Sequence, residues 1–144
     1  MKRSAPLQRK APLKRTAKPM ARTREHRRKP SRRASMPQGL RERVFARAGG
    51  HCDRCGTGLR PDAWDAHHRS PRGMGGDPSK NTPENLVALH RECHAWVEAN
   101  RAAARDQGFL VPDWRNPAEV PVLRHGKSLQ LPTATAWVPY TEGV

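Results

Sequence analysis

The stretch 85-NLVALHRECH-94 joins an apolar run to a segment that carries two histidines and a cysteine. The apolar residues 86–89 favour a short strand, and a brief helical turn is expected just before them. The residues that follow predict a longer helix from about Glu92 to Gln107, with Gly108 as its stop. The centre of the chain is therefore predicted to pass directly from a strand into a helix.

A second strand is predicted upstream, in the stretch 64-WDAHHRSPRGMGG-76. It runs through residues 63–68, and the Gly-, Pro- and Ser-rich segment 69–81 after it is expected to form a loop. Side chains alternate between the two faces of a strand, so His67 and His68 point in opposite directions and cannot easily share one task. The order strand, loop, strand, helix predicts a small α+β domain.

Charge is distributed unevenly along the 144 residues, whose formal net charge is +15. Residues 1–35 contain 14 of the 28 Lys and Arg residues and a single acid, Glu25. We expect this basic arm to be disordered in isolation and to lie along a polyanion such as nucleic acid. It has neither the apolar stripe of a membrane-binding helix nor the continuous apolar core of a signal peptide. The composition indicates a cytoplasmic protein that binds no membrane.

Two further segments flank the predicted centre. Residues 35–50 show helical spacing of apolar side chains, with Ser35 as a cap and two glycines as the stop, so a short amphipathic helix is expected there. Residues 36–108 are then the ordered domain. The Pro-rich segment 109–144 contains short apolar runs that either form small strands packed on the domain or belong to a poorly ordered extension.

Four residues have the spacing of a structural zinc site. The pair Cys52/Cys55 is matched by His90/Cys93 at the same i, i+3 spacing, and the four ligands suit a tetrahedral Zn²⁺ ion. The alternative is a redox C-x-x-C, but that motif is expected at a helix start within a βαβ pattern, which is missing here. His51 is a less well placed substitute for His90.

A second set of polar residues remains once the zinc ligands are removed. His94 and Glu98 lie one turn apart on one face of the predicted helix. With His67 from the strand, they could form an open three-ligand site for a divalent cation. His68 would then be left free as a base, and Asn85 lies nine residues before His94.

The combined pattern resembles the HNH endonucleases. The matching motifs are 66-AHH-68 and 85-NLVALHRECH-94, with the knuckle 52-CDRC-55 ahead of them, and the resemblance covers about residues 50–100. It implies a ββα-metal fold with a structural zinc site. It also implies a metal-dependent endonuclease that hydrolyses DNA phosphodiester bonds, by nicking or by double-strand cleavage.

The resemblance also implies a role for each matching residue. His68 corresponds to the general base, and His67 to the metal ligand just before it, which is an aspartate in many members. Asn85 corresponds to the asparagine that braces the loop and orients the base. His94 corresponds to the final histidine, a metal ligand, and Glu98 stands where some members have a further histidine ligand.

Partners and cofactors follow from the same comparison. The catalytic cation is expected to be Mg²⁺, Mn²⁺, Ni²⁺ or Zn²⁺, and the substrate DNA. Arg69, Arg72 and Lys80 in the loop after the first strand are candidates to grip flanking phosphates. Small basic proteins of this kind resemble those encoded by bacteriophages. The alternative function is therefore a non-catalytic, zinc-stapled nucleic-acid-binding protein or an accessory to phage packaging proteins.

Overall fold

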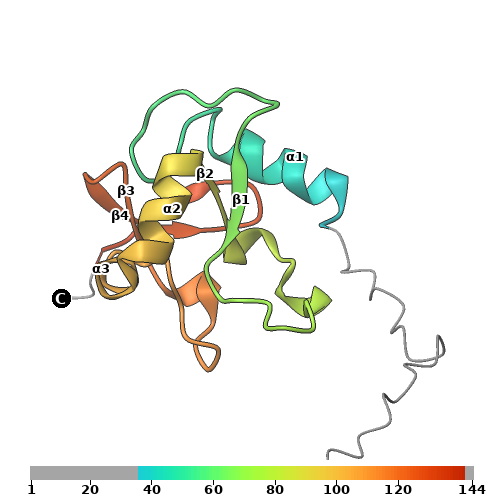
Figure 1. Ribbon diagram of the computed structural model, residues 1–144. Helices are drawn as coiled ribbons and strands as arrows, with labels where there is room; N and C mark the ends of the chain where they lie inside the picture. The colour runs from blue at the N-terminus through green and yellow to red at the C-terminus, as the bar shows by residue number, and fades with distance from the viewer. Residues whose placement is uncertain (1–35, 142–144) are drawn as a thin grey trace, which may run out of the picture. The chain divides into compact units, whose positions relative to one another are not determined.

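The computed structural model describes residues 36–141, so the basic arm 1–35, including the predicted cap Ser35, lies outside the described residues (Figure 1). The elements that build the site are α1 (Gln38–Arg47), β1 (Asp65–His68), β2 (Leu86–Leu89), α2 (Arg91–Ala99) and α3 (Arg101–Asp106). They are followed by β3 (Val122–Arg124), β4 (Ser128–Pro132) and β5 (Trp137–Pro139). Three single turns of 3₁₀ helix cover Pro78–Lys80, Pro83–Asn85 and Pro117–Glu119.

The predicted order strand, loop, strand, helix is confirmed. β1 and β2 pair antiparallel, with His67 opposite Val87 and His68 opposite Leu86. All four residues of β2 are buried, which explains why its sequence is continuously apolar rather than alternating. One residue after β2, α2 begins and packs against both strands, so the α+β class is correct (Figure 1).

The predicted helix 92–107 is interrupted. Asn100 has φ −115° and ψ 54°, a non-helical conformation that separates α2 from α3. Its backbone N–H and its side-chain Nδ2 both donate to the carbonyl of Trp96, each at 2.9 Å, at the end of α2. The predicted stop at Gly108 is confirmed: its φ is +76°, and a Cβ there would lie 1.9 Å from the carbonyl oxygen of Pro121.

The C-terminal segment forms small packed strands, which resolves the alternative left open by the sequence. β3, β4 and β5 make an antiparallel sheet in that order. Val122 of β3 is buried in the hydrophobic core together with Phe109 and Leu110. The segment that follows α3 therefore completes the core of the domain, and it runs beside β1 because the Val111 amide donates to the Arg69 carbonyl at 2.8 Å.

The helix predicted within 35–50 is present as α1. Leu40 and Val44 turn into the core, and Gly49 and Gly50 after the helix both have positive φ. Arg47 at its end is buried and donates to the carbonyls of three distant residues, Pro83, Leu86 and Thr133. Among residues 36–141, no helix has the length and apolar character needed to cross a membrane.

Candidate active site and metal centres

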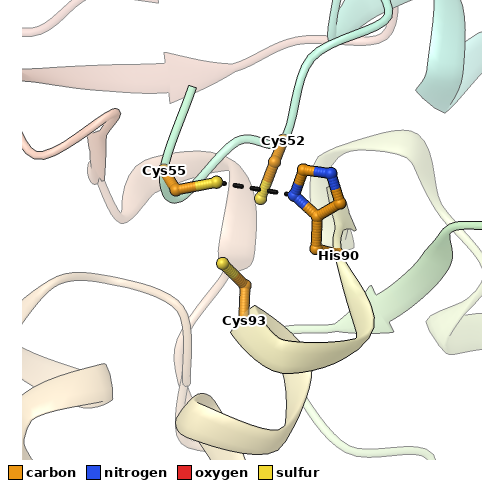
Figure 2. Close-up of side chains that lie close together, drawn as sticks. All are labelled: Cys52, Cys55, His90 and Cys93. Atoms are coloured by element: carbon orange, nitrogen blue, oxygen red, sulfur yellow. Dashed lines mark hydrogen bonds between the residues drawn. The ribbon is translucent and has the colours of Figure 1, made fainter. Parts of the chain in front are cut away.

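Two knuckles from distant parts of the chain bring four metal-binding side chains together. Cys52 and Cys55 belong to the turn after α1, whereas His90 precedes α2 and Cys93 lies in its first turn. The three sulfur atoms and the imidazole point toward one common space (Figure 2). Their ligand atoms all lie within 4.8 Å of one another, an arrangement consistent with a zinc site.

Hydrogen bonds around this group set the tautomer of His90 and the pKa of Cys55 in a way that suits metal binding. His90 Nε2 lies 3.1 Å from the carbonyl of Gly58, which makes Nε2 the donor and leaves Nδ1 facing the thiol of Cys55 at 3.5 Å (Figure 2). Partial burial raises the pKa of Cys55, but hydrogen bonds with Thr57 and His90 outweigh it and lower the pKa to about 6. His51, the substitute ligand considered from the sequence, is exposed and lies outside the group.

A second group consists of His67, His94 and Glu98, whose ligand atoms also lie within 4.8 Å of one another. His67 Nδ1 is 4.0 Å from Glu98 Oε1, and His94 Nε2 is 3.9 Å from the same oxygen. Metal–ligand bonds of about 2.1 Å hold ligand atoms about 3–3.5 Å apart, so the exposed Glu98 would have to move only slightly inward to bind a cation together with the two histidines. The residues present therefore fit a divalent metal.

The two histidines of this group are oriented by their other ring nitrogens. His67 Nε2 lies 3.1 Å from the Phe109 carbonyl, and His94 Nδ1 lies 3.1 Å from Oδ2 of Asp65. In a neutral ring, each acceptor keeps the proton on the nitrogen that faces it. The other nitrogen, which lies toward Glu98, then carries a free lone pair. Burial, followed by the nearby His94, lowers the pKa of His67 to about 4, so its ring is neutral and able to bind a metal at physiological pH.

His68 faces away from this group, as strand alternation requires. Its Nε2 lies 2.9 Å from Oδ1 of Asn81. Burial lowers the pKa of His68, the nearby Arg72 lowers it further, and the hydrogen bond with Asn81 opposes both effects. Within residues 36–141, no hydrogen bond involves Nδ1 of His68. The ring is therefore neutral near pH 7 and has one nitrogen open to accept a proton.

Asn85 is almost completely buried, at 1% exposure, and connects the two ends of the loop between the strands. Its Oδ1 accepts from the Ser70 amide at 2.6 Å, and its Nδ2 donates to the carbonyls of Ser70 and Lys80 at 3.0 and 2.9 Å. All three hydrogen bonds of the Asn85 side chain are therefore made with backbone atoms of the loop. The geometry is that of a loop brace, and among the described residues no hydrogen bond joins the Asn85 amide to the ring of His68.

Residues 52–97 match the family model of the HNH endonucleases. The chain contains an HNH endonuclease domain. The matched range begins at Cys52 and ends one residue before Glu98, so it contains every candidate metal ligand of the two groups except that carboxylate. No curated protein and no solved structure matches the chain. Membership assigns nuclease-type function and divalent-metal binding to the HNH domain in general terms.

The phosphate-binding prediction for Arg69 is wrong. Its side chain is fully buried in the HNH domain and donates to the carbonyls of four residues: Glu84, Gly108, Pro117 and Val120. The guanidinium therefore fastens the C-terminal segment to the loop between the strands and cannot reach a solvent phosphate. Arg72 is partly exposed, and Lys80 is partly exposed with its ammonium group 3.3 Å from Asp113.

Three contributors to the HNH site were not identified from the sequence. Asp65 stands two residues before His67, so strand alternation could have placed both on one face. Asn81 and the carbonyl of Phe109 gave no local signal, because a loop and the segment after α3 bring them to the site. Arg54 is a further neighbour of the zinc-type group: its Nη1 lies 3.8 Å from the sulfur of Cys93.

Proposed function

We propose that this protein is a metal-dependent endonuclease that hydrolyses phosphodiester bonds in DNA, by nicking or by double-strand cleavage. The observation that carries the proposal is the convergence of His67, His94 and Glu98 on one point. It stands beside a strand residue, His68, whose neutral ring has an open nitrogen. Phosphodiester hydrolysis uses a cation site and a nearby base. The consecutive residues His67 and His68 would contribute to each.

In this mechanism His68 is the general base. Its Nδ1 takes a proton from a water molecule, whose oxygen then attacks the phosphorus while the bond to the leaving oxygen breaks. A neutral imidazole is suited to this step because its proton affinity lies near physiological pH. Asn85 supports the geometry by closing the loop that begins two residues after the base.

His67, His94 and Glu98 would hold the catalytic cation, which is Mg²⁺, Mn²⁺, Ni²⁺ or Zn²⁺ in this proposal. When bound, such an ion supplies Lewis-acid stabilisation of charge on the phosphoryl and leaving oxygens. The exposed Glu98 side chain would be free to adjust when an ion binds, whereas the two histidines are oriented by Phe109 and Asp65. The mixed imidazole and carboxylate set does not select sharply among these metals.

The other group would hold a structural zinc ion through Cys52, Cys55, His90 and Cys93. Three thiolates and one imidazole form a closed tetrahedral set, with no position left for a substrate. Arg54 supports this assignment because its guanidinium lies beside the Cys93 sulfur and offsets the negative charge of the thiolates. These four ligands would then join the turn after α1 to the start of α2.

DNA is favoured as substrate by family membership and by the charge of the chain. The arm 1–35 carries half of all Lys and Arg residues, and phosphate binding releases the counterions of DNA. Arg72 and Lys80 are the remaining candidates for phosphate contacts near the base. Deleting residues 1–35 should weaken DNA binding and flatten its salt dependence while leaving cleavage measurable.

Cleavage of supercoiled and linear DNA across a panel of Mg²⁺, Mn²⁺, Ni²⁺ and Zn²⁺ tests the proposal. The wild type should cut, His68→Ala should lose at least about 100-fold in rate, and the exposed control His51→Ala should cut normally. Equal activity in His68→Ala would remove the base assignment. DNA binding without cleavage under all four metals would instead favour the non-catalytic nucleic-acid-binding protein.

A further inference from the structure

We infer that Asn81 is a positioning residue that fixes the tautomer and the orientation of His68. The inference rests on the proposed function of His68 as the base. It concerns a residue outside the triplet His68, Asn85 and His94 that matches the family motif. Asn81 lies 13 residues from His68 along the chain, and its Oδ1 is 2.9 Å from Nε2 of that ring. The contact is partly buried, so water competes with it less than at an exposed site.

The chemical consequence follows from the two kinds of nitrogen in a neutral imidazole. One nitrogen carries a proton and the other a lone pair. An amide oxygen can only accept, so the nitrogen facing Asn81 Oδ1 must be the one that carries the proton. The lone pair is then on Nδ1, the nitrogen that no hydrogen bond occupies within the described residues. Asn81 thereby keeps the base in the one neutral form that accepts a proton at its open nitrogen.

Asn81 is itself held in place by the loop. Its amide donates to the Pro78 carbonyl at 3.0 Å, which closes the 3₁₀ turn Pro78–Lys80. The carbonyl just before it, on Lys80, accepts from Nδ2 of Asn85 at 2.9 Å. Asn85 therefore acts on the position of the base indirectly, through two hydrogen-bonded residues. It holds Ser70, two residues after His68, and it holds Lys80, the residue next to Asn81. The asparagine of the triplet acts on the ring through a second asparagine.

Nitrogen NMR of the histidine rings tests the inference without any need for turnover. Two-bond ¹H–¹⁵N correlation spectra distinguish Nε2–H from Nδ1–H tautomers at a pH where the ring is neutral. The zinc-loaded protein should show His68 as Nε2–H. Asn81→Leu, which keeps the size but removes the acceptor, should give a mixture of both tautomers. Asn81→Asp, which keeps an acceptor oxygen, should remain Nε2–H, as should Ser79→Ala in the same turn.

Kinetics provide the second measurement. Asn81→Leu should lower kcat about 10–100-fold with KM for DNA nearly unchanged, because the base is misaligned while phosphate contacts stay. Asn81→Asp should recover most of the lost kcat, and Ser79→Ala should match the wild type. Each variant is compared at the same zinc content and with the same thermal unfolding midpoint as a check on folding.

The results separate the inference from the function on which it rests. A wild-type His68 in the Nδ1–H form, or an unchanged tautomer in Asn81→Leu, would overturn the role of Asn81. Wild-type kcat in a folded Asn81→Leu variant would overturn it as well. If the spectra behave as expected but no metal supports cleavage by the wild type, the positioning contact stands and the proposed nuclease function fails.

Discussion

Nδ1 of His94 lies 3.1 Å from Oδ2 of Asp65, two residues before His67 on the same strand. The carboxylate fixes the ring of one metal-binding histidine from the strand that supplies the other. Removing such an orienting partner commonly weakens metal binding about 10–100-fold. We expect this loss of Mn²⁺ affinity in Asp65→Ala, measured by titration calorimetry of the zinc-loaded protein.

Asp65 also pairs with Arg91, 3.0 Å from its other carboxylate oxygen, and this arginine is 82% exposed. Arg91→Ala is therefore the matched control, because it removes the surface ion pair and leaves the contact to His94 intact. Its Mn²⁺ affinity should stay within about twofold of the wild type, since exposed ion pairs contribute little. Unchanged affinity in Asp65→Ala would show that His94 needs no orienting partner.

The two adjacent histidines should respond differently to added metal. His67→Ala removes one of three ligands, so its cleavage rate should fall at low Mn²⁺ and partly recover as the concentration is raised. His68→Ala removes the base, and no concentration of Mn²⁺ should restore its rate. Rate measured against Mn²⁺ concentration distinguishes them, and recovery of His68→Ala would assign His68 to the metal instead.

The zinc-type group should control the folding of the domain. A strong zinc chelator, or Cys93→Ser without chelator, should abolish the cooperative thermal transition seen by circular dichroism, because metal binding contributes folding free energy directly. His90→Cys should keep the transition, since thiolate is an equally good zinc ligand. A chelated protein that melts as the untreated one does would exclude a structural metal.

Arg69 should act on stability rather than on DNA binding. Arg69→Lys keeps the charge but cannot serve four carbonyls, so the free energy of unfolding should fall by about 3 kcal/mol or more. Arg60→Lys, at an exposed site paired with Asp62, should change it by less than about 0.5 kcal/mol. Urea denaturation of both variants measures the difference. A phosphate-binding arginine would tolerate lysine, so equal stability would contradict the structural role.

Activity should persist below the ordinary titration range of histidine. Burial and the neighbouring Arg72 lower the pKa of His68 in the free protein, and the base works only when it is neutral. Cleavage should therefore increase with pH on the acidic side, with its midpoint below about 6.5. A rate profile of kcat/KM against pH provides the check, and a midpoint above that value would contradict a buried neutral base.

Local spacing was sufficient to predict which side chains come together in the two groups of candidate metal ligands. The i, i+3 pairs and the i, i+4 pair of His94 and Glu98 depend on the local geometry of a turn and of one helix. The spacing within each pair therefore does not depend on how the rest of the chain folds. Alternation along β1 likewise separated His67 from His68 before any tertiary contact was known. Those features depend only on neighbours in sequence.

The features that sequence reasoning missed all depend on contacts between distant segments. Arg69 was assigned to a loop surface because it follows β1 in a polar stretch, but the C-terminal segment covers it and supplies its acceptors. Asn81 meets His68 only because the loop between the strands closes. The interruption at Asn100 is local, yet asparagine is tolerated in helices often enough that its position alone did not predict a break.

Helix α2 contributes side chains from two neighbouring faces to the two groups of candidate metal ligands, and this constrains its length. Cys93 and His94 are consecutive residues of α2, with one turned to the sulfur group and the other to Glu98 and His67. Inserting a single residue between His90 and Glu98 would rotate everything downstream by about 100° and pull one group apart whichever way the helix settled. Insertions and deletions are therefore not tolerated within this segment, and its nine residues form an indivisible unit of the chain.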